Sequence, residues 1–429
     1  MQKSQLLMSF AVLLSGLLLI TCCLTGVVPK LTGKDTPSLA ATAPLVEPSF
    51  LSPTQKAVPK ETPQQNKNQF VLVPVAGQPL TDITDLWVSP QGDLWAATMD
   101  GIAIHSAEGW RRELEGVAIG KIAGSGRSGV VWVLPASSDE IFSFSGGKWK
   151  KFGTAQGWEP FVEALYLSPG IAESVVETPD GQVWLATGQD DLRRFDPVRD
   201  RWQKLTAEQI GFPRYDEPDY QGYFLTDVAV SGSGKVWVGG CVGQGEQLIG
   251  RGVVHLSDGR WNRIDAVEKV CVLDIEVLPD GDAYVGDYNN LFWYTPATGN
   301  WKVDTLPAFE RSQLVEHIDV DSNGQLWVRV RRMGGASSYG GAAVYHQQEN
   351  HDWVLVYETE VWGGYDFAAG PDGEVYFNSN GVVYRWRDRK LEKLGDLLEP
   401  SVLLAVDGSG VVWAASIGGA GSGLWQITP

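Results

Sequence analysis

The sequence predicts an all-β protein, an eight-bladed β-propeller, from three observations. A motif of glycine, any residue, an apolar residue and an aromatic residue occurs eight times after residue 90. Successive aromatics lie 37, 52, 53, 47, 43, 49 and 37 residues apart, and a four-stranded propeller blade is about 40–50 residues long. Alternating apolar runs flank the motif copies, as half-buried strands require. A ring of seven blades is the alternative.

Each motif copy predicts a tight turn followed by a buried strand. Three of the turns read Pro-Asp-Gly, where proline presets φ and glycine accepts the positive φ that closes the turn. The aromatic then falls in the next strand. The eight copies are residues 92–95, 129–132, 181–184, 234–237, 281–284, 324–327, 373–376 and 410–413.

Further strands complete a blade around each motif. An alternating run such as 83–88 or 272–277 precedes the glycine, and a third strand such as 192–195 follows the aromatic one. A fourth strand carries another tryptophan in six repeats, and flat indole rings fill the large spaces between blades. We therefore interpret these tryptophans as structural: Trp110, Trp149, Trp202, Trp261, Trp301 and Trp353.

The two ends of the repeat region predict how the ring closes. The eighth repeat has strands around 403–406, 411–415 and 423–427, and no fourth strand follows. An additional strand at 69–73 precedes the first repeat and has no other partner. We expect this N-terminal strand to complete the last blade, because such closure removes an open sheet edge.

The N-terminal residues differ in composition from the repeats. Residues 6–28 are almost uninterruptedly apolar, and about 20 apolar residues suffice for a membrane-spanning helix, so 1–28 is predicted to be a signal anchor. The alternative is a lipid anchor, because 19–22 resembles a bacterial lipobox in which Cys22 would be acylated, although Thr21 departs from that pattern. Residues 29–68, rich in Pro, Thr and Gln, are predicted to be a disordered linker.

These features predict a bacterial-type envelope protein, anchored to the membrane, with a propeller at 69–429 outside the cytoplasm. The repeats resemble those of the two-component regulator propeller family over roughly 82–427, most clearly at 92–97, 181–187 and 234–239. The resemblance implies an extracytoplasmic sensor region, which in that family is often joined to a histidine kinase. Because the repeats end with the chain, we do not expect this chain itself to perform phosphorelay.

The sequence contains no recognisable catalytic signature. None of the five histidines lies in a HExxH or other short metal-ligand spacing, and His105 and His255 fall in third strands. No nucleophile elbow, P-loop or dinucleotide fingerprint is present, so we predict no catalytic residue, metal or cofactor, and no enzyme activity. The net charge of −18 argues against nucleic-acid binding, which needs clustered cations.

Two cysteines fall in consecutive blades. Cys241 lies at the end of a second strand and Cys271 at the start of the next inner strand, and both ends face the same side of the ring. A disulfide between them is feasible in an oxidising compartment, although the sequence leaves their separation open.

Long insertions predict which face of the propeller functions. They occupy 153–172, 206–224, 242–251, 306–314 and 331–341, all on the face that holds the second-to-third-strand and blade-to-blade loops. Aromatic, arginine and carboxylate side chains are typical of recognition surfaces, and loops on rigid scaffolds often carry function. The alternative is that these loops cap the channel. The candidate contacts are Trp158, Tyr215, Asp216, Tyr220, Tyr223, Arg331, Arg332 and Tyr339.

The sequence thus favours a membrane-tethered binding or sensor module that recognises an unknown protein, carbohydrate or peptide. One alternative is a metal-dependent propeller enzyme, because the fold is similar to that of streptogramin lyases, whose activity depends on a metal near the channel. The other alternative is an envelope scaffold protein.

Overall fold

The computed structural model describes most of the chain after residue 70. The described residues are 71–74, 80, 82–124, 128–136, 139–160, 174–187, 191–213, 220–244, 247–288, 290–304, 306, 313–321, 323–333, 339–359, 366–379, 381–396, 402–416 and 423–428. The predicted anchor and linker, with Cys22, lie outside them. Within the described part of the chain, no helix is long and apolar enough to cross a bilayer.

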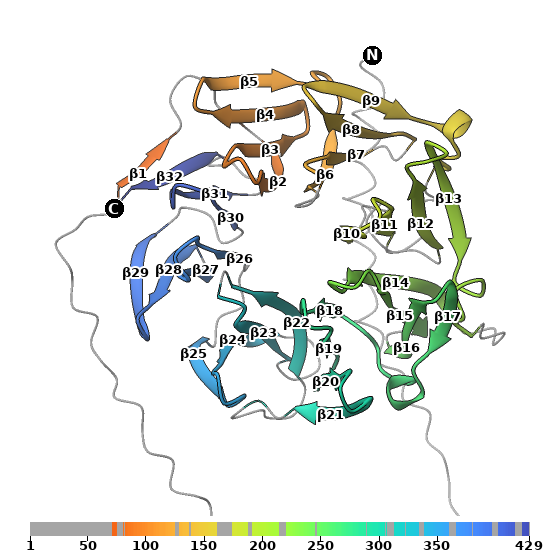
Figure 1. The fold of residues 1–429 in the computed structure, drawn as a ribbon. Coiled ribbons are helices and arrows are strands. Elements are labelled where there is room, and N and C mark those ends of the chain that lie inside the picture. The colour runs from red at the N-terminus through yellow and green to blue at the C-terminus, as the bar shows by residue number, and fades with distance from the viewer. Residues whose placement is uncertain are drawn as a thin grey trace, which may run out of the picture. The chain divides into compact units, whose positions relative to one another are not determined.

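Eight four-stranded antiparallel sheets form the ring of a β-propeller (Figure 1). Each sheet runs from an inner strand beside the channel to an outer strand at the rim. The first four blades are β2 (Ile83–Val88), β3 (Leu94–Thr98), β4 (Gly101–Ser106), β5 (Gly109–Glu113); β6 (Ile119–Gly124), β7 (Val131–Pro135), β8 (Ile141–Ser145), β9 (Lys148–Phe152); β10 (Ser174–Glu177), β11 (Val183–Ala186), β12 (Asp191–Asp196), β13 (Arg201–Thr206); β14 (Tyr220–Val230), β15 (Val236–Gln244), β16 (Gln247–Ser257) and β17 (Arg260–Arg263).

The second half of the ring repeats the same order. Two short 3₁₀ turns, η1 (Thr154–Gln156) and η2 (Asp265–Val267), lie in the connections after blades two and four. The last four blades are β18 (Asp274–Val277), β19 (Ala283–Gly286), β20 (Leu291–Thr295), β21 (Asn300–Asp304); β22 (Gln313–Val320), β23 (Leu326–Met333), β24 (Tyr339–Gln347), β25 (Trp353–Thr359); β26 (Phe367–Ala369), β27 (Val375–Ser379), β28 (Val382–Arg387), β29 (Lys390–Asp396); β30 (Val402–Val406), β31 (Val412–Ser416), β32 (Leu424–Thr428) and β1 (Val71–Pro74).

The last blade is assembled from both ends of the propeller, as the sequence predicts. Strand β1 pairs antiparallel with β32, with Val71 opposite Thr428 and Leu72 opposite Ile427. Inner strand β30 contacts β2 of the first blade, so the ring is continuous. The alternative of seven blades is therefore wrong.

Tryptophans fill the spaces between blades. The motif tryptophans are at most 3% exposed, and they meet aromatic side chains of the following blade. Trp132 of blade two lies 5.2 Å from Trp202 of blade three, edge to face, a favourable aromatic geometry. The two third-strand histidines belong to the same layer, since His105 contacts Trp413 and His255 contacts Trp237.

The two faces of the ring differ in their connections. One face, here called the turn face, carries the turns from first to second strands and from third to fourth strands. These turns are tight: the amide of Gly181 donates to the carbonyl of Thr178, and Gly181 has a φ of 81° that favours glycine. Because β32 ends at Thr428 on the turn face and β1 runs antiparallel to it, the chain enters the propeller at Val71 on this face.

Candidate binding face

Blades four and six are taller than the others. Strands β14, β15 and β16 have 11, 9 and 11 residues, and β22 to β25 have 8, 8, 9 and 7, whereas the strands of blade five have only 4 or 5. Strands β15, β19 and β23 each begin two residues after their motif glycine, so the additional length lies at the opposite end. At about 3.3 Å per residue, β15 rises about 16 Å beyond β19.

This additional length defines what we call the extended face: residues 240–244 of β15 and 330–333 of β23, with their partners on neighbouring strands. The predicted insertion at 242–251 is therefore largely a hairpin, since β15 and β16 pair from Val236–Leu256 up to Gln244–Gln247. Paired strands satisfy backbone hydrogen bonds that a loop would leave to solvent. The described part of the extended face is consequently built from paired strands.

A disulfide secures the base of this extension. Cys241 on β15 and Cys271 before β18 are bonded, with their Cα atoms 4.8 Å apart, and both are buried. The chain preceding Cys271 packs directly on β16: a Cβ at Gly250 would lie 2.0 Å from the carbonyl oxygen of Lys269. Glycine is therefore required at this position, and the bond the sequence left open is present.

Most of the predicted contacts that the structure describes fall on the extended face. The backbone of Tyr220 pairs with Gln244 and that of Tyr223 with Val242. On blade six, Arg331 and Arg332 lie on β23, and Tyr339 pairs with Met333. Tyr215 and Asp216 lie outside the described residues.

Arg331 is held by an ion pair. Its Nε lies 2.5 Å from Oε1 of Glu316, and the Nε of Arg329 lies 3.8 Å from Oε2 of the same carboxylate. Arg331 keeps about a quarter of its side chain exposed. Two guanidinium groups thus share one carboxylate at the edge of the extended face.

Trp158 must be removed from the set of candidate contacts. Its side chain is 0% exposed, and its ring packs 5.1 Å from that of Trp202. The guanidinium of Arg193 covers it at 4.8 Å. A ligand on the surface cannot reach this indole. An aromatic residue in an insertion can pack the insertion against the blades instead of contacting a ligand, and Trp158 does so because it is buried.

A ring of carboxylates around the channel, of which Asp227 is buried and the other three are half-buried, was not predicted from the sequence. Four blades carry aspartate seven residues before the motif glycine, and each carboxylate accepts a hydrogen bond from a backbone amide of the next inner strand. The acceptor–donor pairs are Asp85 with Ile122 at 2.8 Å, Asp227 with Ile275 at 2.7 Å, Asp274 with Ile318 at 2.5 Å and Asp366 with Leu404 at 2.6 Å. The recurrence of aspartate seven residues before the motif glycine is the sequence signal that could have revealed this ring.

The threonine before two of these aspartates completes the contact between blades. Thr84 donates to the carbonyl of Ile119, and Thr226 donates to the carbonyl of Val272. A β-bulge at this point in β2 and β14 turns the side chains toward the neighbouring blade. These bonds join successive inner strands edge to edge, so the carboxylates have a structural task.

The surroundings of these carboxylates shift their ionisation. Burial raises the pKa of Asp85 to about 6. Burial and the nearby charge of Asp274 raise the pKa of Asp227 well above its usual range. Burial opposes ionisation of Asp274 itself, but the hydrogen bond and charge of His317, whose Nδ1 lies 3.2 Å away, lower its pKa. The pKa of His317 is raised, because Asp274 outweighs the effect of burial.

Glu276 lies on the same inner strand as Asp274. Burial and the charges of Asp319 and Asp274 raise its pKa well above the usual range. Among the residues that the structure describes, no three His, Cys, Asp or Glu side chains are arranged to hold a metal ion.

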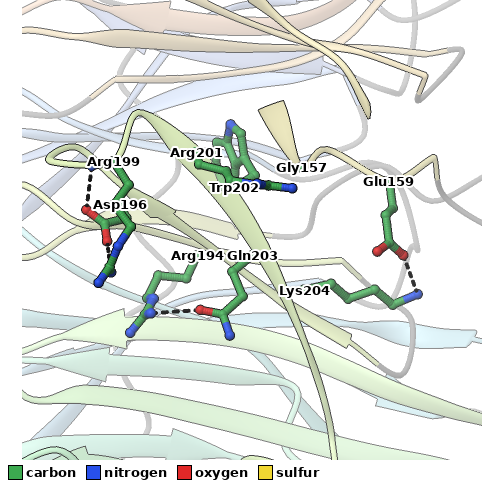
Figure 2. A pocket seen from close by; sticks show the side chains of 9 residues that line it. All are labelled: Gly157, Glu159, Arg194, Asp196, Arg199, Arg201, Trp202, Gln203 and Lys204. Atoms are coloured by element: carbon green, nitrogen blue, oxygen red, sulfur yellow. Dashed lines mark hydrogen bonds and ion pairs between the residues drawn. The ribbon is translucent and has the colours of Figure 1, made fainter. Parts of the chain in front are cut away.

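A separate cleft lies on the outer side of blade three. It has a volume of about 380 Å³, and four of its lining side chains are cationic (Figure 2). Figure 2 shows Arg199 beside Asp196, Arg194 beside Gln203, and Lys204 beside Glu159. The lining residues are Gly157, Glu159, Arg194, Asp196, Arg199, Arg201, Trp202, Gln203 and Lys204.

Comparison with known proteins supports the fold. No family model matches the chain, and no curated protein matches it. Among solved structures, the extracellular domain of the BT4673 one-component system from B. thetaiotaomicron is 12% identical with a TM-score of 0.41. That match covers 82% of this chain and 52% of the other, so the chain spans about half the length of that extracellular domain.

Two other propellers are similar over nearly their whole length. The Dos1 propeller is 10% identical with a TM-score of 0.51, over 83% of this chain and 95% of that one. YCF48, solved with a D1 peptide, is 12% identical with a TM-score of 0.47, over 86% and 99%. At 10% identity, the likeness to the Dos1 propeller shows a shared fold and nothing about ligands.

Proposed function

We propose that the chain is an extracytoplasmic, membrane-tethered binding propeller whose extended face recognises a protein, peptide or carbohydrate. The observation that carries this proposal is that, among the described strands, those of blades four and six are lengthened, and on one face. Strands longer than a blade needs add no closure to the ring, yet they cost conformational entropy to order. A surface raised in this way serves contacts with another molecule.

The point at which the chain enters supports the same orientation. Val71 enters on the turn face, so the predicted tether would join the propeller on the face opposite the extended face. The disulfide between Cys241 and Cys271 fits an oxidising compartment outside the cytoplasm. The predicted anchor in 1–28 and linker in 29–68 would supply the tether.

Ligand capture by matched variants tests the proposal. The full chain is immobilised and exposed to an envelope extract of its source, and retained proteins and glycans are identified by mass spectrometry. We expect a ligand retained by the wild type to be lost from a Tyr220→Ala/Arg332→Ala variant. It should persist with Glu108→Ala/Val198→Ala, whose changes lie on the turn face. Equal retention by both variants would remove the extended face from consideration.

The metal-dependent enzyme remains the alternative hypothesis. It predicts a divalent metal bound stoichiometrically by the purified, folded chain, which elemental analysis measures directly. A folded chain purified without chelators and carrying no metal would exclude it.

A further inference from the structure

The cleft on blade three is preformed by a buried network. Trp158 fills the space beside Trp202, and Arg193, 1% exposed, covers Trp158 and donates a hydrogen bond to the carbonyl of Glu159. The Nε of Arg193 also lies 2.9 Å from Oδ1 of the buried Asp191. Burying an ion pair carries a desolvation penalty that apolar packing would avoid. Here the pair holds the segment that forms one wall of the cleft.

Glycine at position 157 lets this wall approach β13. Gly157 has a φ of 81°, and a Cβ there would lie 2.2 Å from the carbonyl oxygen of Trp202. The turn formed by η1 therefore rests directly on the backbone of β13, and the next residues extend along it to Glu159. The cleft is a rigid feature whose shape depends on one glycine and one buried tryptophan.

The charge of the cleft is opposite to that of the chain. The cleft is lined by two carboxylates, Glu159 and Asp196, and by four cations, so the lining has two excess positive charges; the cations are Arg194, Arg199, Arg201 and Lys204. The whole chain has a net charge of −18. A cationic site in an otherwise acidic protein concentrates anions locally.

The two carboxylates are already engaged. Asp196 pairs with Arg199, and Glu159 lies 3.6 Å from Lys204. Among the described residues, neither Arg194 nor Arg201 has a carboxylate partner, although Arg194 donates to the side-chain oxygen of Gln203 at 2.7 Å. The two arginines lie on neighbouring strands: Arg194 on β12 pairs with Gln203 on β13, and Arg201 lies two residues before Gln203. Guanidinium groups bind carboxylates through paired hydrogen bonds, so two of them suit an acidic ligand.

From these observations we infer that the cleft is a second binding site, separate from the extended face, for a peptide segment bearing glutamate or aspartate. A peptide suits the lining because it presents carboxylates to Arg194 and Arg201, and amide donors and acceptors to Gln203 and the wall. The volume falls within the range of ligand pockets, about 300 to 1,000 Å³. Short peptide segments, rather than folded surfaces, fit such a space.

Fluorescence anisotropy with a defined peptide tests this inference. The full chain is titrated into a labelled decapeptide of alternating Glu and Ser, and into a Gln–Ser peptide of equal length. We expect the Glu peptide to bind more tightly by at least tenfold, with affinity falling as salt is added. An Arg194→Gln/Arg201→Gln variant should lose at least tenfold in affinity, while its melting temperature stays near that of the wild type.

The control is Arg111→Gln/Arg112→Gln, which removes the same charge from the rim of blade one. It should leave the affinity for the Glu peptide unchanged. A further variant, Gly157→Ala, should weaken binding by moving the wall. Three results would overturn the inference: no preference for the Glu peptide, an equal loss with the blade-one control, or arginine-dependent binding of heparin without binding of the peptide.

Discussion

Exchanging Asp407 for serine should destabilise the propeller, and the reverse exchange at Ser231 should stabilise it. Both residues begin the turn six residues before a motif tryptophan, Trp413 and Trp237 respectively. Oδ2 of Asp407 accepts the indole N–H of Trp413 at 3.1 Å. The indole nitrogen of Trp237 is buried and has no hydrogen-bond partner among the described residues.

The two side chains perform the same local task in the turn. Oδ1 of Asp407 accepts the amide of Val411 at 3.0 Å, and Oγ of Ser231 accepts the amide of Lys235 at 3.0 Å. Serine can therefore replace the bond within the turn but cannot reach the indole. Blade six repeats the aspartate arrangement, with Asp321 accepting the indole of Trp327.

The magnitude follows from the bond that changes. A hydrogen bond to a charged group contributes about 1.5 to 3 kcal/mol, and an unsatisfied buried donor costs about 1 to 3 kcal/mol. Part of this is offset because serine needs less desolvation than a carboxylate. We expect Asp407→Ser to lower the free energy of unfolding by about 1 to 2 kcal/mol, and Ser231→Asp to raise it by about 1 kcal/mol.

Urea denaturation followed by circular dichroism measures both changes. A double-mutant cycle with Trp413→Phe isolates the indole bond, since phenylalanine keeps much of the packing but has no N–H. Asp407→Ser should cost little once Trp413 is phenylalanine. Equal costs in the two backgrounds, or destabilisation by Ser231→Asp, would refute the assignment of the aspartate as the indole's partner.

Three further changes test other parts of the structure. Replacing Cys241 and Cys271 by serine should lower the free energy of unfolding by about 3 to 4 kcal/mol for a bridge of this span, and a reducing agent should then have no further effect on the denaturation midpoint. Burial raises the pKa of Asp85 from 3.8 to about 6, so protonation of this carboxyl stabilises the fold below pH 4, and the stabilisation is lost as pH rises through 6. The denaturation midpoint of Asp85→Asn should therefore lack this pH dependence between pH 4 and 7. Trp158→Ala should cost about 3 to 5 kcal/mol and Trp158→Phe less, whereas equal midpoints would contradict its role as an anchor.

The blade count and the closure of the ring could be predicted because both depend on local signals. The turn glycine and the aromatic two residues into the next strand recur in every blade, and the strand at 69–73 had only one available partner. Placement of the insertions on one face also followed from strand order alone. Such features depend on backbone geometry, which short motifs specify well.

The roles of particular side chains could not be predicted in the same way. Trp158 is a residue type that often contacts ligands. Its burial against Trp202, however, depends on how the connection after blade two folds back along blade three. The hydrogen-bond partners of the channel aspartates lie far away in the sequence, 37 residues for Asp85 and 44 for Asp274. The insertion at 242–251 largely continues strands β15 and β16, because its two sides pair with each other, and its glycine-rich sequence does not reveal this pairing. Long-range packing decides each case.

Photo-crosslinking measures directly whether the extended face recognises another molecule. A photoreactive phenylalanine analogue is placed at Tyr223 on β14 in one full-length variant, and at Val198, 94% exposed on the turn face, in another. Each is irradiated with the envelope extract, and crosslinked partners are identified by mass spectrometry. We expect a specific crosslinked partner from position 223 and none from position 198. A partner joined only from position 198 would contradict this expectation.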